Sequence, residues 1–447
     1  MNNSLKCNYY RIGDVFLNYT FNDIKDKNYV KIGSYEGTFD SNIEMDQNQQ
    51  RNRFKKIIEP WLSAALQTDH LSLLLGSGFT TAVCQIAGAS SSSMEKAEFG
   101  EFSQKINEFS TRSAEKMGRG SANIEDQIRT AFSLLRGYEI EGKKKEYERL
   151  SNLLNSVLEN FTSSILSSET NLKNVITSDN GKKAISTLQS FLLTFASRTA
   201  TRERTHIFTT NYDRIIEYGC DVSGIKILDR FWGKVIPKFE ESPSSIDYYY
   251  HTPDAKNEFR YAEGVVRYSK IHGSIDWYED NGTVYRDALR FGTDKISLPN
   301  GTTYRDHLMI YPNSMKSVET AFYPYAELFR DFGSSICRPN STLFTYGYGF
   351  GDTHINKIIK EMLMVPSTHI VVISYQADER LKSFLESVNM AQITLLLGEE
   401  FASLEKLVDY YLPKAAIDML TTTASKLLEA RKTYSEIGDE RNKGGTE

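Results

Sequence analysis

Short apolar runs alternate with helix-like segments from residue 205 onward in this 447-residue chain. The apolar runs occupy residues 205–209, 268–272, 341–346, 369–374 and 392–397. Between several of these runs, helical periodicity marks residues 318–337, 354–364, 378–389 and 401–411. Such alternation requires parallel strands joined by crossover helices. The sequence therefore predicts an α/β fold with a Rossmann-like, doubly wound parallel sheet.

Two earlier patterns complete the predicted organisation. The leucine-rich run at residues 71–75 ends abruptly at Gly76, as expected for a strand buried on both faces. Apolar side chains in residues 150–158 recur at helical spacing and indicate a helical insertion. We expect an N-terminal arm with short strands (1–52), the start of the core (53–94), a helical insertion (95–200), the rest of the core (201–412) with an irregular insertion at 279–313, and a C-terminal helix with a polar tail (413–447).

Composition excludes several classes of protein. The chain has 53 Lys and Arg against 58 Asp and Glu, so no direct nucleic acid binding is predicted, because a broad phosphate-binding surface needs a basic excess. The four cysteines are widely scattered, which disfavours a disulfide framework and a cysteine-rich zinc site. No apolar run approaches the roughly 20 residues of a membrane span, and the N-terminus has no signal-like apolar stretch. We expect a cytoplasmic protein without a membrane partner.

A glycine-containing loop follows the leucine-rich run and comprises Gly76, Ser77, Gly78, Phe79 and Thr80. Its two glycines allow a tight turn and a close approach to a pyrophosphate, and the following helix N-terminus favours negative charge. The loop lacks the third glycine of the dinucleotide fingerprint, since position 81 is threonine. A simple strand-to-helix turn is therefore an equally good interpretation of this motif alone.

Polar residues also follow the runs at 205–209 and 268–272. Thr210, Asn211 and Asp213 come after the first run, where they can hydrogen-bond a ribose or a water; alternatively, Asp213 caps the next helix. His272 and Gly273 end the second run, where an imidazole has room for a ligand and a pKa suited to proton transfer. A lone histidine is more often structural, so its weight depends on the neighbouring motifs.

A fourth polar segment follows the run at 341–346 and comprises Gly347, Tyr348, Gly349, Phe350, Gly351 and Asp352, with His354 two residues further on. In their order and strand context, the first three motifs resemble the G-A-G-x-S loop, the T-Q-N-x-D segment and the catalytic H-G of sirtuins. The fourth is similar to the G-Y-S-F-x-D-x-H-I-N signature of the bacterial sirtuin-like branch. The resemblance spans residues 71–397, interrupted by insertions.

This resemblance implies roles for individual residues. Asn211 matches the asparagine that positions the ribose and an attacking water, His272 matches the general base, and Asp213 matches the acid that supports the nicotinamide side of the pocket. Thr210 lies beside the ribose. The remaining residues are implied to bind NAD: Gly76, Ser77, Gly78, Phe79 and Thr80 in the first loop, and Gly347, Tyr348, Gly349, Asp352 and His354 in the fourth segment.

The chain departs from deacetylase sirtuins in one respect that bears on its reaction. No cysteine lies between Cys220 and Cys337, so the four-cysteine zinc module is absent and no zinc is expected. The resemblance then favours water as the acceptor, with NAD as the substrate and ADP-ribose and nicotinamide as products. The alternatives are a protein deacylase or ADP-ribosyltransferase, and a non-catalytic sensor of NAD or ADP-ribose; the presence of both Asn211 and His272 argues against the sensor.

Zinc-less bacterial sirtuin-like proteins with helical insertions resemble effectors of antiphage defence, which deplete cellular NAD in abortive infection. The resemblance therefore implies a role of this kind. It also implies partners, either further copies of the chain in a homo-oligomer or a HerA-like hexameric ATPase.

Overall fold

The computed structural model describes residues 6–10, 16–20, 29–32, 35–38, 47–92, 95–116, 122–199, 201–240, 246–250, 260–296, 304, 307–309 and 323–414. The C-terminal helix and tail are predicted at residues 413–447, and of these residues 415–447 lie outside this set. Within the described ranges, no helix is long and apolar enough to cross a membrane.

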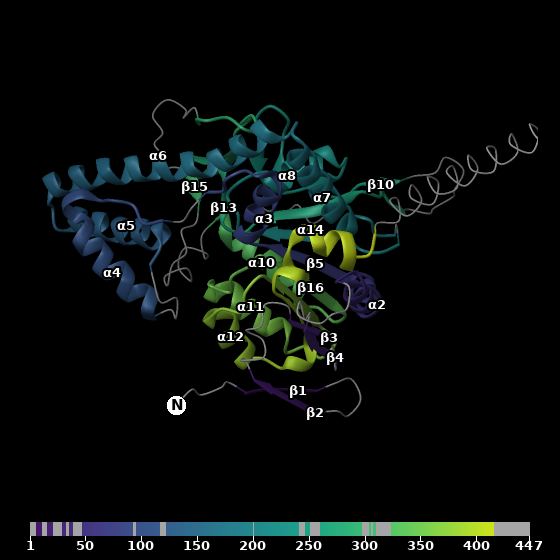
Figure 1. Ribbon diagram of the computed structural model, residues 1–447. Coiled ribbons are helices and arrows are strands. Elements are labelled where there is room, and N and C mark those ends of the chain that lie inside the picture. The colour runs from purple at the N-terminus through teal and green to yellow at the C-terminus, as the bar shows by residue number, and fades with distance from the viewer. Residues whose placement is uncertain are drawn as a thin grey trace, which may run out of the picture.

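A nine-stranded sheet forms the centre of the molecule (Figure 1). Its order is β4 (Tyr35–Thr38), β3 (Tyr29–Ile32), β18 (Ile393–Leu397), β17 (His369–Ser374), β16 (Ser341–Tyr346), β5 (His70–Leu75), β6 (His206–Thr209), β12 (Val265–Lys270) and β7 (Lys226–Leu228). The strands from β18 to β7 are parallel, whereas β3 and β4 are antiparallel to their neighbours. The prediction of an α/β fold with a doubly wound, mostly parallel sheet is confirmed.

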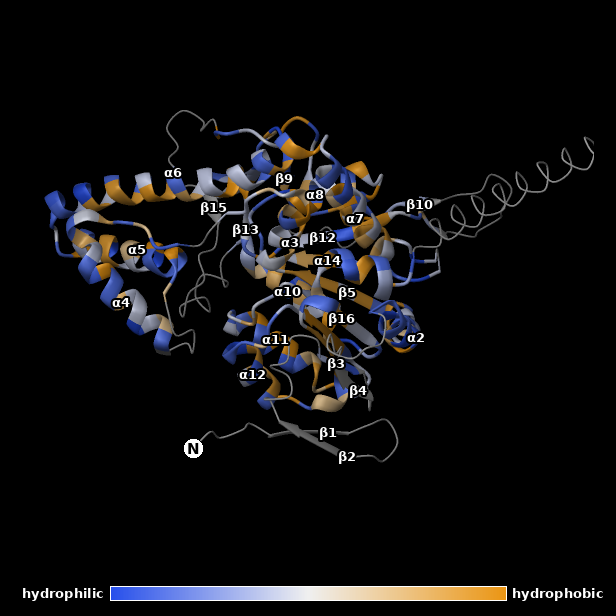
Figure 2. Cartoon of the chain, in the orientation of Figure 1, coloured by the Kyte–Doolittle hydropathy of each residue, from blue (hydrophilic) through white to orange (hydrophobic). Residues whose placement is uncertain are grey.

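Helices cover both faces of this sheet. The first face carries α2 (Gln47–Leu66), α3 (Ser77–Ala87), α7 (Asp179–Ala196) and α8 (Ile215–Val222), and the second carries α10 (Tyr325–Ile336), α11 (Thr353–Met362) and α12 (Glu379–Glu386). Successive side chains of β5 point to opposite faces, so that Leu73 and Leu75 join one core and Leu74 joins the other. The central strands β5 and β16 are accordingly buried along nearly their whole length, and β5 is largely hydrophobic (Figure 2).

Three helices form a separate layer with its own core: α4 (Ser103–Lys116), α5 (Ile124–Ile140) and α6 (Lys144–Val175). In Figure 1 they project to one side of the sheet, and the long α6 runs back to it. The apolar repeat seen in the sequence is buried here, since Leu150, Leu154 and Leu158 are fully covered. The start of α5 is fixed by a capping box between Asn123 and Asp126.

A second sheet includes part of the irregular insertion expected at residues 279–313. It is antiparallel, with the order β15 (His307–Met309), β13 (Gly273–Asp280), β14 (Thr283–Arg286), β9 (Lys238–Phe239) and β8 (Phe231–Trp232). Asn281 and Gly282 join β13 to β14 with φ values of 50° and 74°, the backbone of a tight hairpin turn. The expectation of irregular structure was therefore wrong for residues 279–286.

The predicted N-terminal arm contains four short strands. β1 (Lys6–Tyr10) and β2 (Phe16–Thr20) pair with each other as an antiparallel hairpin. β3 and β4 instead extend the main sheet beyond β18.

Candidate active site

A cavity of about 440 Å³ lies where the strand order reverses, at the carboxyl ends of β5 and β16. Open α/β sheets bind ligands at such a switch point because the loops after neighbouring strands diverge there. The structure brings most of the residues singled out in the sequence to its wall: Gly76, Ser77, Gly78, Thr80, Thr210, Asn211, Asp213, His272, Gly347, Tyr348, Gly349 and Asp352.

Two of the singled-out side chains lie elsewhere. The Phe79 side chain is fully buried in the core, where it packs against Phe191 and Tyr346 with ring centroids 5.2 and 5.8 Å away. His354 points its ring at the edge of Phe329, with centroids 4.9 Å apart. Neither residue lines the cavity, so the structure gives their side chains a packing role.

The glycines of the first and fourth motifs bring two loops into direct backbone contact. Gly76 N donates to Tyr346 O at 3.0 Å, and Gly78 N donates to Gly347 O at 3.1 Å. A Cβ atom on Gly76 would approach Tyr348 Cα to 2.8 Å, and one on Gly78 would approach Gly347 Cα to 2.7 Å. Gly347 itself has a φ of +63°, which favours glycine. These glycines therefore close the floor of the cavity.

The orientation of the Asn211 amide follows from its partners. Its Nδ2 donates to Gly76 O at 3.1 Å and to Thr80 Oγ1 at 3.0 Å. The backbone carbonyl can only accept, and the Thr80 hydroxyl donates its proton to Asp213 Oδ2 at 2.7 Å, so the amide nitrogen must face both. Asn211 Oδ1 is buried and accepts no hydrogen bond from any described residue. A ligand hydroxyl or a water can supply that hydrogen bond.

Asp213 is held from both sides. Its Oδ2 accepts from Thr80, and its Oδ1 accepts the backbone N–H of Ile215 at 3.1 Å, at the start of α8. Asp213 therefore makes an Asx turn one residue before the N-cap of α8, Arg214, and also lies on the cavity wall.

His272 and Asp352 form a buried pair. Nε2 of His272 lies 2.9 Å from Oδ2 of Asp352, and both residues are less than a tenth exposed. Asp352 Oδ1 accepts the N–H groups of His354 at 2.9 Å and Ile355 at 3.3 Å, at the N-terminus of α11. Oδ1 thus fixes the carboxylate at the N-terminus of α11, and Oδ2 orients the imidazole of His272. When a neutral His272 donates from Nε2, the basic lone pair lies on Nδ1.

Tyr348 stabilises the loop that carries Asp352. Burial raises the pKa of Tyr348 well above its ordinary value, so the phenol stays protonated and can donate. Its hydroxyl donates to Asn356 Oδ1 at 2.9 Å and lies 3.2 Å from the Asp352 carbonyl. Asn356 Nδ2 in turn donates to Phe350 O at 2.8 Å. Tyr348 therefore helps to set the position of Asp352.

Several residues of the wall were not identified from the sequence. Asn123 and Glu125 come from the start of α5, and Tyr212 donates its hydroxyl hydrogen to Glu125 Oε1 at 3.0 Å. Arg380, on the first turn of α12, is the only arginine or lysine among the described residues that line the cavity. The sequence offered a weak signal for Arg380, since it follows a strand end of the sheet, but none for the two α5 residues.

The described residues contain no group of three or more His, Cys, Asp or Glu side chains that could hold a metal ion. Cys84 and Cys220 are buried free thiols, and burial raises the pKa of Cys84 to about 12. The polar side chains of the described cavity wall are thus two amides, an imidazole paired with a carboxylate, further carboxylates, several hydroxyls and one guanidinium.

The doubly wound sheet and the position of the cavity define the class of the molecule as a Rossmann-like α/β protein with a ligand site at the switch point. Residues 205–393 match the family model described as a SIR2-like domain. The chain therefore contains a SIR2-like domain, which uses NAD and implies an NAD-related activity. The match includes the loops after β6, β12 and β16, whereas the loop at Gly76 precedes it. Among curated proteins, none matches the chain.

Proposed function

We propose that the chain is an NAD hydrolase that cleaves the bond between nicotinamide and ribose. The proposal is carried by one observation: two groups meet on one cavity wall. They are Asn211 Oδ1, a buried acceptor without a partner among the described residues, and the His272–Asp352 pair. The cavity volume of about 440 Å³ falls within the range of roughly 300–1,000 Å³ that is usual for small-molecule sites.

The reaction balances as NAD⁺ plus water giving ADP-ribose, nicotinamide and a proton. Departure of nicotinamide leaves positive charge on the ribose, so an attacking water must be held and deprotonated on the open side of the sugar. In the proposal, Asn211 Oδ1 holds a ribose hydroxyl or this water, and His272 takes the proton. Asp352 orients the imidazole and stabilises its positive charge after the transfer.

The pyrophosphate in the middle of the substrate has matching groups on the wall. The N-terminus of α3 at Ser77 favours an anion, and Arg380, which forms an ion pair with Asp378 at 2.7 Å, presents a guanidinium to the cavity. Gly349 lies beside this guanidinium, since a Cβ built on it would be 3.5 Å from Nη2 of Arg380. We assign the pyrophosphate to the space between the N-terminus of α3 and Arg380 on α12.

Incubation of the purified full chain with NAD tests the proposal. We expect free nicotinamide and ADP-ribose in equal amounts, and we expect His272→Ala to lose about 10²–10⁴-fold in rate, the usual contribution of a general base. Asn211→Ala should lose activity as well. Bound NAD without product would favour a sensor, and product only with an acetylated peptide would favour a deacylase.

The wider role is also proposed from the resemblance to bacterial sirtuin-like effectors. We infer a cytoplasmic antiphage effector that depletes NAD and works as a homo-oligomer or with a HerA-like hexameric ATPase. Measurement of NAD in infected cells that carry wild-type or His272→Ala protein tests the first part. Mass measurement of the purified chain, alone and mixed with an ATPase of this type, tests the second.

A further inference from the structure

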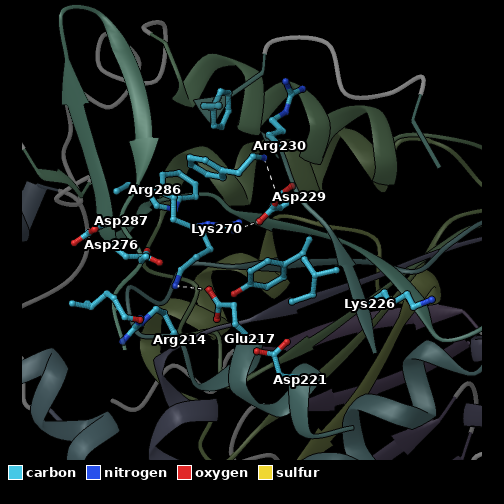
Figure 3. Close-up of a pocket in the computed structure, with 18 of the residues that line it drawn as sticks. Arg214, Glu217, Asp221, Lys226, Asp229, Arg230, Lys270, Asp276, Arg286 and Asp287 are labelled. Atoms are coloured by element: carbon cyan, nitrogen blue, oxygen red, sulfur yellow. Dashed lines mark hydrogen bonds and ion pairs between the residues drawn. The ribbon is translucent and has the colours of Figure 1, made fainter. Parts of the chain in front are cut away.

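A second cavity, of about 710 Å³, lies beside the outer edge of the main sheet (Figure 3). Its walls come from α8, β7, β12 and the second sheet, and it shares no lining residue with the candidate active site. Its volume suits a small organic ligand.

Two of the three arginines on this wall have carboxylate partners that lie outside the cavity. Arg214 forms two side-chain hydrogen bonds to Glu169, at 2.6 and 3.2 Å, and Arg230 forms two to Asp331, at 2.6 and 2.7 Å. Neither Glu169 nor Asp331 lines the cavity. Both arginines therefore have a carboxylate partner outside the space that a ligand would occupy, and Arg214 also lies near the charges of Asp276 and Glu217.

The remaining charges leave the cavity negative. Its described lining has five cationic side chains, and without Arg214 and Arg230 three remain: Lys226, Lys270 and Arg286. Five acidic side chains face them: Glu217, Asp221, Asp229, Asp276 and Asp287. Five acids against three cations leave an excess of two acidic groups. A cationic ligand would be attracted by this excess.

Asp276 supplies the buried acceptor of the site. It is 7% exposed, and its Oδ1 accepts no hydrogen bond from any described residue. Burial is the main cause that raises the pKa of both Glu217 and Asp229, and the nearby charge of Asp276 raises both further. A buried carboxylate oxygen without a donor is costly, so a ligand that brings a charged donor gains the corresponding free energy.

Aromatic side chains line the same space. Phe231 and Trp277 pack with ring centroids 4.9 Å apart, and Phe239 lies 6.1 Å from Trp277. Aromatic faces attract cations and cover apolar groups. A ligand with a positive head and an apolar body therefore matches this wall better than a bare metal ion does.

We propose that this cavity binds a small organic cation, with its ammonium or guanidinium group on Asp276 and its apolar body against Phe231 and Trp277.

One side chain, that of Lys270, connects this cavity to the candidate active site. Lys270 donates to the backbone carbonyls of Tyr212 at 3.1 Å and Asp213 at 2.5 Å, and to Glu217 Oε1 at 3.0 Å.

This contact predicts that the cation acts as an effector. A positive group near Glu217 competes with Lys270 for the Glu217 carboxylate, a contact that Figure 3 marks with a dashed line. Because Lys270 also binds backbone carbonyls of the loop that holds Asn211 and Asp213, this competition changes how the loop is held. Coupling between two sites is reciprocal, so NAD and the cation should alter each other's affinity by the same factor. This coupling, unlike the binding site itself, rests on the proposed function.

Calorimetric titration of the full chain with benzylamine and with benzyl alcohol tests the binding site without any need for NAD turnover. The two probes have the same ring and differ in charge. We expect benzylamine to bind about tenfold or more tightly than the alcohol, and Asp276→Asn to remove that advantage, because a hydrogen bond to a charged group is worth about this much. Asp280→Asn, the same change at an exposed residue of the same strand, should leave the affinity unchanged.

Equal affinity for the two probes, or an unchanged affinity in Asp276→Asn, would overturn the proposal. Thermal unfolding controls for the fold of the variant: since Asn removes a buried carboxylate whose Oδ1 has no donor among the described residues, the free variant should unfold at the same or a higher temperature. A marked fall would assign Asp276 to structure and overturn the site. Binding without an effect on NAD affinity would overturn the coupling and retain the cation site.

Discussion

Asp352 uses its two carboxylate oxygens for different purposes. One oxygen accepts N–H groups at the start of α11, and the other contacts the imidazole of His272. The two residues are 80 positions apart and follow β12 and β16, which β5 and β6 separate in the sheet. Sequence patterns singled out both residues but could not predict their contact, because the contact depends on strand order and on the exact end of each strand.

The first prediction concerns this contact. In Asp352→Asn we expect kcat for NAD cleavage to fall about 10–100-fold, the usual effect of losing a residue that orients a functional histidine. Asparagine caps a helix about as well as aspartate, so the thermal midpoint should hardly change. Steady-state kinetics and calorimetry on the same sample separate the two effects. An unchanged kcat would show that the carboxylate serves only as a helix cap.

Gly347 allows a sharper test of backbone packing because Gly264 offers a matched control. Both have similar φ values, +63° and +67°, but a Cβ on Gly264 meets nothing within 4 Å, whereas one on Gly347 would meet Gly78 and Phe79. Gly264→Ala should cost only the strain of a left-handed residue, about 1–2 kcal/mol. Gly347→Ala should cost about 1–3 kcal/mol more from overpacking and lower NAD affinity. Denaturant unfolding measures the difference, and equal losses would contradict the inferred contact.

At the scale of elements, periodicity predicted the helical insertion but not what it does. Asn123 and Glu125 reach the cavity only because α5 packs beside the loop after β6, and no local pattern encodes that packing. The second sheet was missed for another reason. The Asn281-Gly282 turn is a strong hairpin signal, but it stands in a segment whose many Gly, Asn and Asp residues read as irregular.

The bond between Tyr212 and Glu125 links the insertion to the site, and removing it is the third prediction. Tyr212→Phe loses a hydrogen bond to a carboxylate, worth about 1.5–3 kcal/mol. We expect faster hydrogen exchange in the first turns of α5 and a raised KM for NAD. Tyr138→Phe, in the same helical core but away from the cavity, serves as the control. Unaltered exchange in α5 would indicate that the insertion is held without this bond.

At the scale of the whole molecule, the two ends of the main sheet carry different chemistry. The candidate active site occupies the carboxyl ends of the strands, whereas His206 and His369 are the first residues of β6 and β17, at the opposite end. His206 lies 2.9 Å from the hydroxyls of Ser269 and Ser335, and His369 Nε2 lies 2.7 Å from Thr394 Oγ1. Burial lowers the pKa of His206 well below its ordinary value and that of His369 to about 4. Both rings are therefore neutral in the folded protein near neutral pH.

This arrangement predicts that acid destabilises the fold independently of the active site. The unfolded chain takes up protons at both histidines near pH 6.5, while the folded chain resists them, so stability is complete above about 6.5 and is lost as the pH falls toward about 4. Paired carboxylates behave differently, and Glu203 is an example: its hydrogen bonds with Arg338 and His70 outweigh burial and lower its pKa. Such carboxylates lose their contribution to the stability of the fold only when the pH falls below their ordinary pKa of 4.5. The thermal midpoint should fall between pH 7 and 5, and His369→Gln should flatten that slope because glutamine does not titrate. Identical slopes in the variant and the wild type would show that His369 takes up its proton in the folded state, and that its burial does not set the acid limit of the sheet.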